Sequence, residues 1–166
     1  MLLLRWLIRF TAALALLAGA VVLSSRYADG PLGPLPGGKL ASGPFVTQPV
    51  GDWAFATGVA EIEMQLDSQS TSRTTWILVH EGRAYIPAAA EFPPGKTWHR
   101  VALEDGRAVL RIDGKRYPVQ LAKVDDAAVQ AAVRKVAEAK YPSRPAGEIW
   151  LFSVTSRAAP ADDQRQ

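Results

Sequence analysis

The segment from Gly95 to Arg100 carries the side chains best suited to chemistry. It reads Gly-Lys-Thr-Trp-His-Arg, and its Lys96 and Arg100 could donate charge-assisted hydrogen bonds to a phosphate. It also lies where the charge of the chain changes sign. Residues 51–95 hold two basic and six acidic side chains, whereas residues 96–123 hold seven basic and three acidic ones. The segment is therefore a candidate for a local anion site, the alternative being that its cations are ordinary solvated surface charge.

The histidines and serines form no recognisable catalytic constellation. His80 precedes a turn and His99 follows Trp98. Either imidazole could donate a proton near neutrality, and the alternative for each is an exposed histidine without a function. No serine lies in a Gly-x-Ser-x-Gly elbow, and two isolated histidines do not make a zinc site. The catalytic residues are therefore unknown, and no metal is expected.

The positive charge of the chain comes from outside its central part. The formal net charge is +3, yet residues 51–156 hold 13 basic and 13 acidic side chains. A neutral domain binds nucleic acid poorly, because that affinity rests on clustered cations, so no nucleic-acid partner is expected. The chain has no cysteine, which excludes disulfides, thiolate metal sites and cysteine nucleophiles. One domain of roughly 100 residues fits the available length.

Residues 1–23 predict a segment that enters the inner membrane. Arg5 and Arg9 lie ahead of an apolar run that ends at Leu23. Basic residues in this position keep the N-terminus cytoplasmic and send the following domain to the periplasmic side. Ala18-Gly19-Ala20 also fits a signal-peptidase site. Both a single-pass signal anchor and a cleaved signal peptide therefore stay open, and both export the domain.

Residues 27–50 have the composition of an irregular, extended connection. They contain five Gly and five Pro. Residues 33–39 match the start of a nucleotide-binding loop, but Leu40 replaces the hydroxyl residue that would hold magnesium, so we exclude that function. The segment could be a loose spacer, or it could pack along the domain through Phe45 and Val46. The expected organisation is a signal anchor or signal peptide (1–26), a Pro/Gly-rich linker (27–50), a folded domain (51–156) and a disordered tail (157–166).

Alternating apolar and polar residues predict a meander of antiparallel strands. From Ala60 to Asp67 the alternation is typical of a strand with one buried face. In 74–80 both faces are apolar, which favours a central strand of a closed sheet. The Asp113-Gly114 pair predicts a hairpin with a type I′ turn. The strands are expected at 60–67, 74–80, 83–87, 107–112, 115–123 and 148–155.

Two helices are expected within the domain. A short helix within 96–103 would cross one end of the barrel. Asp125 is the expected N-cap of a longer helix over 126–140. Its buried stripe would consist of Val129, Ala132, Val133 and Val136. These elements predict a mainly β, α+β fold with six or seven strands and one longer helix near the C-terminus, preceded by the N-terminal transmembrane or signal helix.

The motifs in this order carry a resemblance to a known family. They are Trp76-Ile-Leu-Val, Gly82, Tyr85-Ile, Gly95-Lys-x-Trp-x-Arg100 and Val109-Leu-Arg-Ile-x-Gly114, followed by a basic strand, a helix and a closing strand. This order resembles the split β-barrel proteins, and more narrowly the flavin- or deazaflavin-binding nitroreductase-like and pyridoxamine-phosphate-oxidase-like families. The resemblance covers about Asp52 to Thr155, and its motifs are diffuse.

The resemblance implies a homodimer with a cofactor groove between two barrels, and FMN or another flavin as the cofactor. By position, Lys96 and Arg100 would contact its phosphate, Trp98 would wall the groove, and Trp76 with Tyr85 would lie near the ring. The alternative is that the tryptophans only fill the core and the two cations are surface charge.

Two functions follow as hypotheses. The first is a membrane-anchored, exported flavin-binding protein, which as an enzyme would be a flavin- or deazaflavin-dependent oxidoreductase. In such proteins the cofactor performs the chemistry, so no catalytic triad is needed. The second is a non-catalytic envelope barrel, for binding or scaffolding, that has lost the cofactor.

Overall fold

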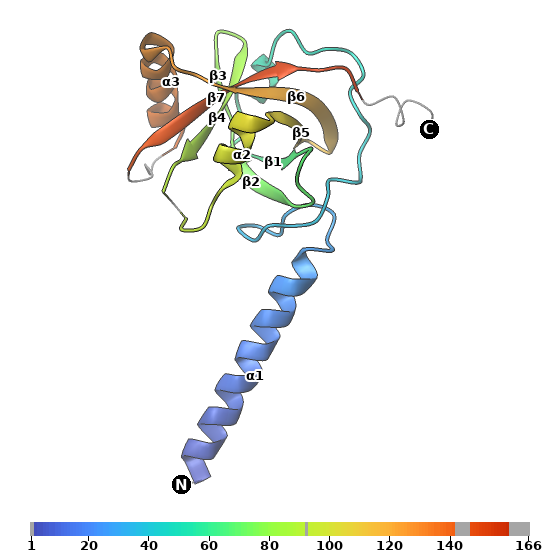
Figure 1. Cartoon of the computed structure of the whole chain (residues 1–166), viewed down its shortest axis with the longest axis vertical. Coiled ribbons are helices and arrows are strands. Elements are labelled where there is room, and N and C mark those ends of the chain that lie inside the picture. The colour runs from blue at the N-terminus through green and yellow to red at the C-terminus, as the bar shows by residue number, and fades with distance from the viewer. Residues whose placement is uncertain (1, 92, 142–146, 160–166) are drawn as a thin grey trace.

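The computed structural model describes residues 2–91, 93–141 and 147–159. A long N-terminal helix stands apart from a curled antiparallel sheet, and shorter helices pack on the sheet (Figure 1). The helices are α1 (Leu2–Ser25), the 3₁₀ helix η1 (Ala54–Ala56), α2 (Trp98–Glu104) and α3 (Ala127–Lys140). The strands are β1 (Glu61–Leu66), β2 (Ser72–Trp76), β3 (Leu78–His80), β4 (Arg83–Ala89), β5 (Arg107–Ile112), β6 (Lys115–Lys123) and β7 (Ile149–Ser156).

All seven strands belong to one sheet with the order β2-β1-β5-β6-β7-β4-β3. Every neighbouring pair is antiparallel. β2 and β3 are the two ends of this order, yet only Ile77 separates them along the chain. The sheet therefore curls until both of its ends belong to a single run of residues. The predicted mainly β fold, with a small antiparallel barrel and one longer helix near the C-terminus, is confirmed.

The prediction of one central strand over 74–80 is wrong. The run divides at Ile77 into two end strands, each with one partner. The Ile77 carbonyl accepts hydrogen bonds from Lys140 Nζ, at 2.9 Å, and from the Tyr141 hydroxyl, at 3.1 Å. Because side chains from the end of α3 satisfy this carbonyl, the chain can leave one partner strand and join another there. The second apolar face of the run is covered by α3 rather than by a second sheet.

The β5–β6 hairpin has the predicted turn. Asp113 and Gly114 have φ values of 48° and 73°, and a type I′ turn requires positive φ at both positions. Glu81 and Gly82, between β3 and β4, have φ values of 51° and 71°. Both tight connections therefore have the backbone twist that keeps the adjoining strands paired.

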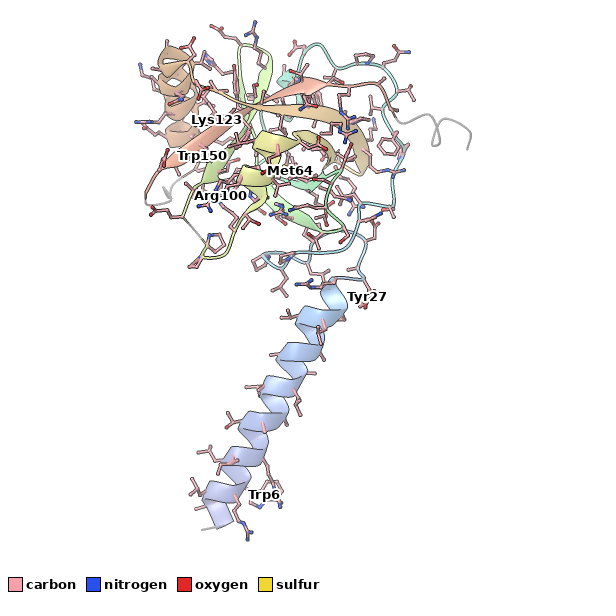
Figure 2. All side chains as sticks on the ribbon, viewed as in Figure 1. Trp6, Tyr27, Met64, Arg100, Lys123 and Trp150 are labelled. Atoms are coloured by element: carbon pink, nitrogen blue, oxygen red, sulfur yellow. The ribbon has the colours of Figure 1, made fainter. Side chains whose placement is uncertain are left out.

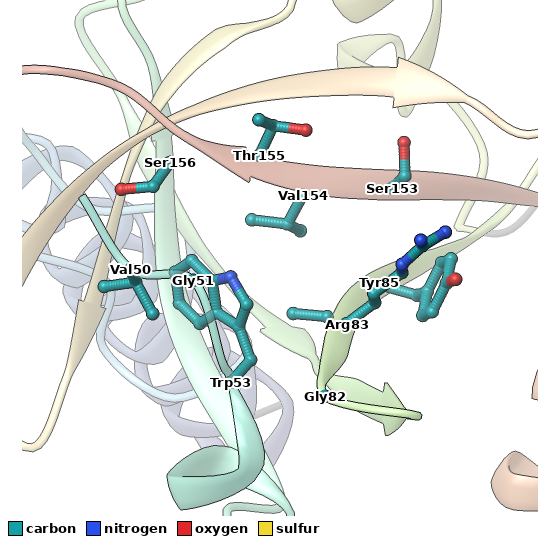
Figure 3. A pocket seen from close by; sticks show the side chains of 11 residues that line it. Val50, Gly51, Trp53, Gly82, Arg83, Tyr85, Ser153, Val154, Thr155 and Ser156 are labelled. Atoms are coloured by element: carbon teal, nitrogen blue, oxygen red, sulfur yellow. The ribbon is translucent and has the colours of Figure 1, made fainter.

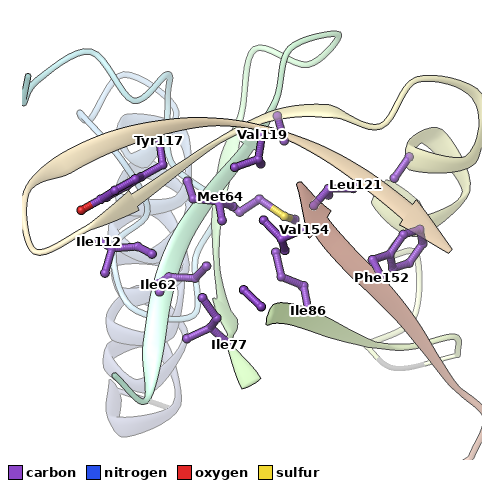
Figure 4. Packing of buried hydrophobic residues seen from close by; sticks show 14 of the residues in the cluster. Ile62, Met64, Ile77, Ile86, Ile112, Tyr117, Val119, Leu121, Phe152 and Val154 are labelled. Carbon is purple, nitrogen blue, oxygen red and sulfur yellow. The ribbon is translucent and has the colours of Figure 1, made fainter. Parts of the chain in front are cut away.

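Inward-pointing side chains fill the barrel (Figure 4). Ile62, Met64 and Leu66 of β1 are all buried, as their alternation predicts. Phe152 and Val154 of β7 enter the same interior cluster, and so do Trp98 and Ala102 of α2. At about 1.5–3 kcal/mol for each large buried side chain, this interior is the main source of stability. Because apolar side chains fill this interior, we look for a functional site at the ends and on the outer surface of the barrel.

Helix α3 covers part of the outer face of the sheet. Val133 is its buried centre, and it packs in a second cluster with Leu78, Tyr85, Tyr141 and Leu151. The helix begins one residue later than predicted. Asp126, not Asp125, is the N-cap, because its carboxylate accepts the amide hydrogens of Ala128 and Val129 at 2.8 and 3.2 Å.

The Pro- and Gly-rich segment lies against the barrel, and we call residues 26–46 the collar. Gly37 pairs with Ser72 of β2, and Phe45 bridges to Arg116 of β6. Arg116 also donates to the Gly43 carbonyl at 2.7 Å and lies 3.9 Å from the centre of the Phe45 ring. Of the two alternatives left by the sequence, the structure therefore has the packed one.

Helix α1 is long and apolar enough to cross a membrane by length and composition. The candidate span is Leu3–Ser25, and none of the residues in its apolar 18-residue window is buried against the rest of the chain. Figure 1 shows the helix projecting from one end of the barrel. A signal sequence satisfies the same criteria, so the fold alone establishes an N-terminal apolar helix of either kind.

Candidate functional site

Trp98, which the resemblance placed in the wall of a groove, lies in the barrel interior. It is the first residue of α2, only 3% exposed, and its ring centre lies 5.5 Å from that of Phe152. The indole therefore contributes to the core. Its ring can still support charges that lie next to it, because the face of an indole attracts cations.

Two cations flank Trp98. The Arg73 guanidinium carbon lies 5.8 Å and Lys96 Nζ 6.0 Å from the centre of the Trp98 ring. Lys96 belongs to the loop before α2, and Arg73 comes from β2, more than twenty residues earlier in the sequence. We call Arg73, Lys96 and Trp98 the cationic corner.

The charges of this corner are poorly compensated. Arg73 Nη2 donates to Gln69 Oε1 at 2.7 Å, but Arg73 Nε is buried without a hydrogen-bond partner. Within the described ranges, no carboxylate lies within 4.0 Å of Arg73 or Lys96. Burial lowers the pKa of Arg73 to about 10. Burial, and then the nearby charge of Arg73, also lower the pKa of Lys96. A bound anion would relieve both effects.

Sequence reasoning missed Arg73, although one signal for it exists. In the register of β1 and β2, Arg73 is opposite Met64, and cross-strand partners point to the same face of a sheet. Met64 is completely buried in the interior. An arginine in phase with interior-facing residues has to reach an opening or a polar partner. The pairing of β1 with β2 was needed to see this.

Arg100 lies on α2 but is not part of the cationic corner. It is exposed, and it has no carboxylate partner among the residues that the structure describes. Figure 2 shows it on the same side of the molecule as Lys123 and Trp150. Lys123 Nζ lies 4.7 Å from the centre of the Trp150 ring and 3.6 Å from Asp125. Arg100 is therefore an exposed cation of α2, two residues after Trp98, and not a third cation at the Trp98 ring.

His99 is buried, which excludes the exposed role considered for it. It is 0% exposed, and both of its ring nitrogens lack a hydrogen-bond partner. Its ring meets Trp150 edge-on, with 4.9 Å between the ring centres. Burial lowers the pKa of His99, and the charges of Lys96 and Arg100 lower it further. Both effects favour the neutral imidazole. His80 is partly exposed at the end of β3, 4.0 Å from Glu81.

Trp76 and Tyr85 are close together but belong to the α3 side of the sheet. The Trp76 ring stacks on Tyr141, with 4.1 Å between centres and 8° between planes. Tyr85 is buried in the same outer cluster. The structure thus divides the predicted site residues into two groups, with Lys96 and Trp98 in one and Trp76 and Tyr85 in the other.

A separate pocket of about 410 Å³ lies beside Trp53, over the paired ends of β4 and β7 (Figure 3). Its lining combines hydroxyl groups from β7 with Arg83 and Tyr85 of β4 and the Trp53 ring. Of the five predicted site residues, Tyr85 alone lines it. Among the described residues, no group of three or more metal-ligating side chains could hold a metal ion.

The cationic corner suits one half of a flavin nucleotide better than the other. The guanidinium and the ammonium group suit a phosphate, and the orphaned Arg73 Nε indicates a missing acceptor. For the isoalloxazine ring, the aromatic side chains that could form a wall are already used. Trp98 packs on Phe152, and Trp76 packs on Tyr141.

Comparisons with known proteins found matches among solved structures alone. No family model matches the chain, and no curated protein is similar to it. Among solved structures, it is similar to a protein of Listeria innocua provisionally described as a pyridoxamine 5′-phosphate oxidase. The similarity covers 58% of this chain and 82% of that one, with 9% sequence identity and a TM-score of 0.43.

Proposed function

We propose that the chain is a single-pass membrane protein whose barrel, on the periplasmic side, binds the phosphate of a flavin nucleotide such as FMN. The cationic corner is the observation that supports the binding part of this proposal. Arg73 and Lys96 keep two uncompensated charges beside one ring, at a cost in stability that a phosphate would offset.

The continuity of α1 up to the packed residue Ser25 supports our choice of an anchor over a cleaved signal. Ser25, the last residue of α1, is only 1% exposed, and its hydroxyl lies 3.0 Å from the Pro36 carbonyl of the collar. The helix also continues without a break through Ala18-Gly19-Ala20. Cleavage there would separate the last turn of α1 from the rest of the helix. The intact mass of protein extracted from membranes tests this point: an anchor retains residues 1–25, and a mature chain that starts near 21 would contradict it.

A homodimer is part of the same proposal. A single chain offers the phosphate half of a flavin site, and the groove for the ring would form where two barrels meet. If the bound ring remains accessible, the protein would be an oxidoreductase, with the flavin supplying the hydride chemistry. This chain's own residues would bind and orient the cofactor.

Loss of one cation tests the phosphate site. The full-length protein in detergent is titrated with FMN, and we expect micromolar affinity. Charge-assisted hydrogen bonds contribute about 1.5–3 kcal/mol, so Lys96→Ala should weaken binding by roughly tenfold or more. Arg107→Ala is the matched control, because Arg107 is an exposed cation that pairs with Asp105 at 2.8 Å. Equal affinity for Lys96→Ala and Arg107→Ala would show that the phosphate site lies elsewhere.

The packing of the tryptophans favours a second candidate, a non-catalytic envelope barrel. Trp98 and Trp76 both have structural partners, so the fold could keep them without a cofactor. This candidate predicts no flavin absorbance in the isolated protein and no micromolar affinity for added FMN. The same titration therefore separates the two functions.

A further inference from the structure

The collar is fixed to the barrel by a network around Arg111 of β5. Arg111 Nη1 donates to Asp29 Oδ1 at 2.9 Å, and Nη2 donates to the Asp29 carbonyl at 2.9 Å. Arg111 Nε donates to Glu63 of β1, and the Arg111 side chain is only 10% exposed. Gly30 has φ +93°, and a Cβ at this position would collide with the Arg111 guanidinium. The start of the collar therefore has one well-defined position on the barrel.

The collar is also fixed to the end of α1. The Ser25 hydroxyl at the end of α1 lies 3.0 Å from the Pro36 carbonyl, and within the collar the Gly38 amide donates to the Ala28 carbonyl at 3.0 Å. Between these contacts, Leu32 and Leu35 exchange two backbone hydrogen bonds of 3.1 Å, which form a tight turn. The tip of this turn is attached to β2, since the Thr74 hydroxyl donates to the Gly33 carbonyl at 2.8 Å. Helix, collar and barrel are thus joined by contacts on both sides of the turn.

Aromatic residues mark the two ends of the span. Trp6 and Tyr27 are exposed at opposite ends of the helical segment (Figure 2). The helix rises by about 28 Å from Trp6 to its end at Ser25, and Tyr27 follows in a turn, so the two rings are separated by close to the roughly 30 Å of a hydrocarbon core. Trp and Tyr prefer the headgroup level of a bilayer. This spacing places Tyr27, which is 92% exposed, in the outer headgroup layer.

The turn of the collar lies at this level as well. In Figure 1 the collar runs across the end of α1, between the helix and the barrel. Leu32 is 50% exposed in this turn. Arg26 is exposed beside Tyr27, and no carboxylate of the described residues lies within 4.0 Å of it. An apolar side chain, an aromatic ring and a free cation are what the headgroup layer binds.

We infer that residues 26–36 form a lipid-contact loop that rests on the outer surface of the membrane that α1 spans, with Leu32 in the interface and Arg26 beside lipid phosphates. The inference depends on the proposed anchor. Because the loop is joined to both α1 and the barrel, its contact with the lipid headgroups fixes the orientation of the barrel relative to the membrane. The end that carries η1 (teal in Figure 1) faces away from the membrane.

Site-directed spin labelling tests the inference, and the absence of cysteine makes each label unique. Leu14→Cys, Leu32→Cys and Phe55→Cys are made in the full chain and reconstituted in vesicles of phosphatidylethanolamine and phosphatidylglycerol. Leu14 is the bilayer reference in α1. Phe55, an exposed apolar residue of η1, is the aqueous control. Collisions with oxygen, which concentrates in the bilayer, are compared with collisions with a water-soluble nickel chelate.

The expected order of the oxygen-to-nickel ratio is Leu14, then Leu32, then Phe55, with the Leu32 label several-fold above the Phe55 label. If the Leu32 label is as accessible to nickel as the Phe55 label while the Leu14 label is shielded, the lipid-contact loop is wrong and the anchor stands. If the Leu14 label is also exposed to nickel, α1 does not span the bilayer, and both the proposed anchor and the lipid-contact loop are wrong. Thermal unfolding of each variant confirms that the label has not disrupted the fold.

Discussion

At the scale of single residues, some cations of this chain hold the fold together and others are candidate ligands for an anion. Arg111 and Arg116, in the basic stretch after Gly95, hold the collar, so that stretch is not one continuous anion site. Arg73 and Lys96 are partly buried and have no carboxylate partner among the described residues, whereas Arg26 and Arg100, which also have none, are exposed. The pair has formed because β2 brings an arginine to the loop that precedes α2. The burial and the hydrogen-bond partners of each cation therefore distinguish structural cations from candidate ligands better than the number of charges in a sequence segment does.

The N-cap of α3 gives a prediction at this scale. Asp126→Ala removes the acceptor for two amide hydrogens and should lower the free energy of unfolding by about 1 kcal/mol. Asp125→Ala is the neighbouring control, and we expect a change within roughly 0.5 kcal/mol, as for most surface substitutions. Urea unfolding of the full chain in detergent measures both. A larger loss for Asp125→Ala would contradict the cap assignment.

At the scale of elements, the collar is part of the fold and not a spacer. Its Gly and Pro residues suit close packing of backbone on backbone as well as they suit an extended linker, so their composition could not distinguish the two. The strand periods, the type I′ turn and the stripe of α3 were readable from the sequence because each depends on neighbouring residues. The break at Ile77 and the position of Arg73 were not, because the first depends on Lys140, 63 residues later, and the second on the register in which β2 pairs with β1.

Acid should release the collar, and this is a prediction at the scale of elements. Burial alone would raise the pKa of Asp29, but hydrogen bonds from Ser42, the Ala41 amide and Arg111 outweigh it and hold that pKa well below its usual range. A carboxyl with a depressed pKa in the folded state stabilises the protein above its unfolded pKa, about 3.9, and this contribution is lost as the pH falls further. The free energy of unfolding should therefore decrease below about pH 4.

Asp29→Asn isolates this contribution. The variant should be less stable than wild type at neutral pH and should lose less stability on acidification. Glu104→Gln, which neutralises an exposed carboxylate of α2, serves as the control for changed net charge. Parallel pH profiles for wild type and Asp29→Asn would contradict the role assigned to the collar network.

At the scale of the whole molecule, an apolar N-terminal helix, the collar and the barrel are joined in the order that the proposed anchor requires. The apolar helix, the collar and the barrel are joined by hydrogen bonds on each side of the turn at Leu32. In Figure 1 the short helix α2, which carries Trp98 of the cationic corner, lies on the barrel and away from α1.

The difference in affinity between FMN and riboflavin tests the central claim most directly. The two molecules share the ring, and only FMN has the phosphate. With the full-length protein in detergent, we expect FMN to bind at least about tenfold more tightly than riboflavin, since the phosphate gains charge-assisted hydrogen bonds from Arg73 and Lys96. Lys96→Ala should reduce this preference. Equal affinities for FMN and riboflavin, or no binding of either, would contradict a phosphate site at the cationic corner.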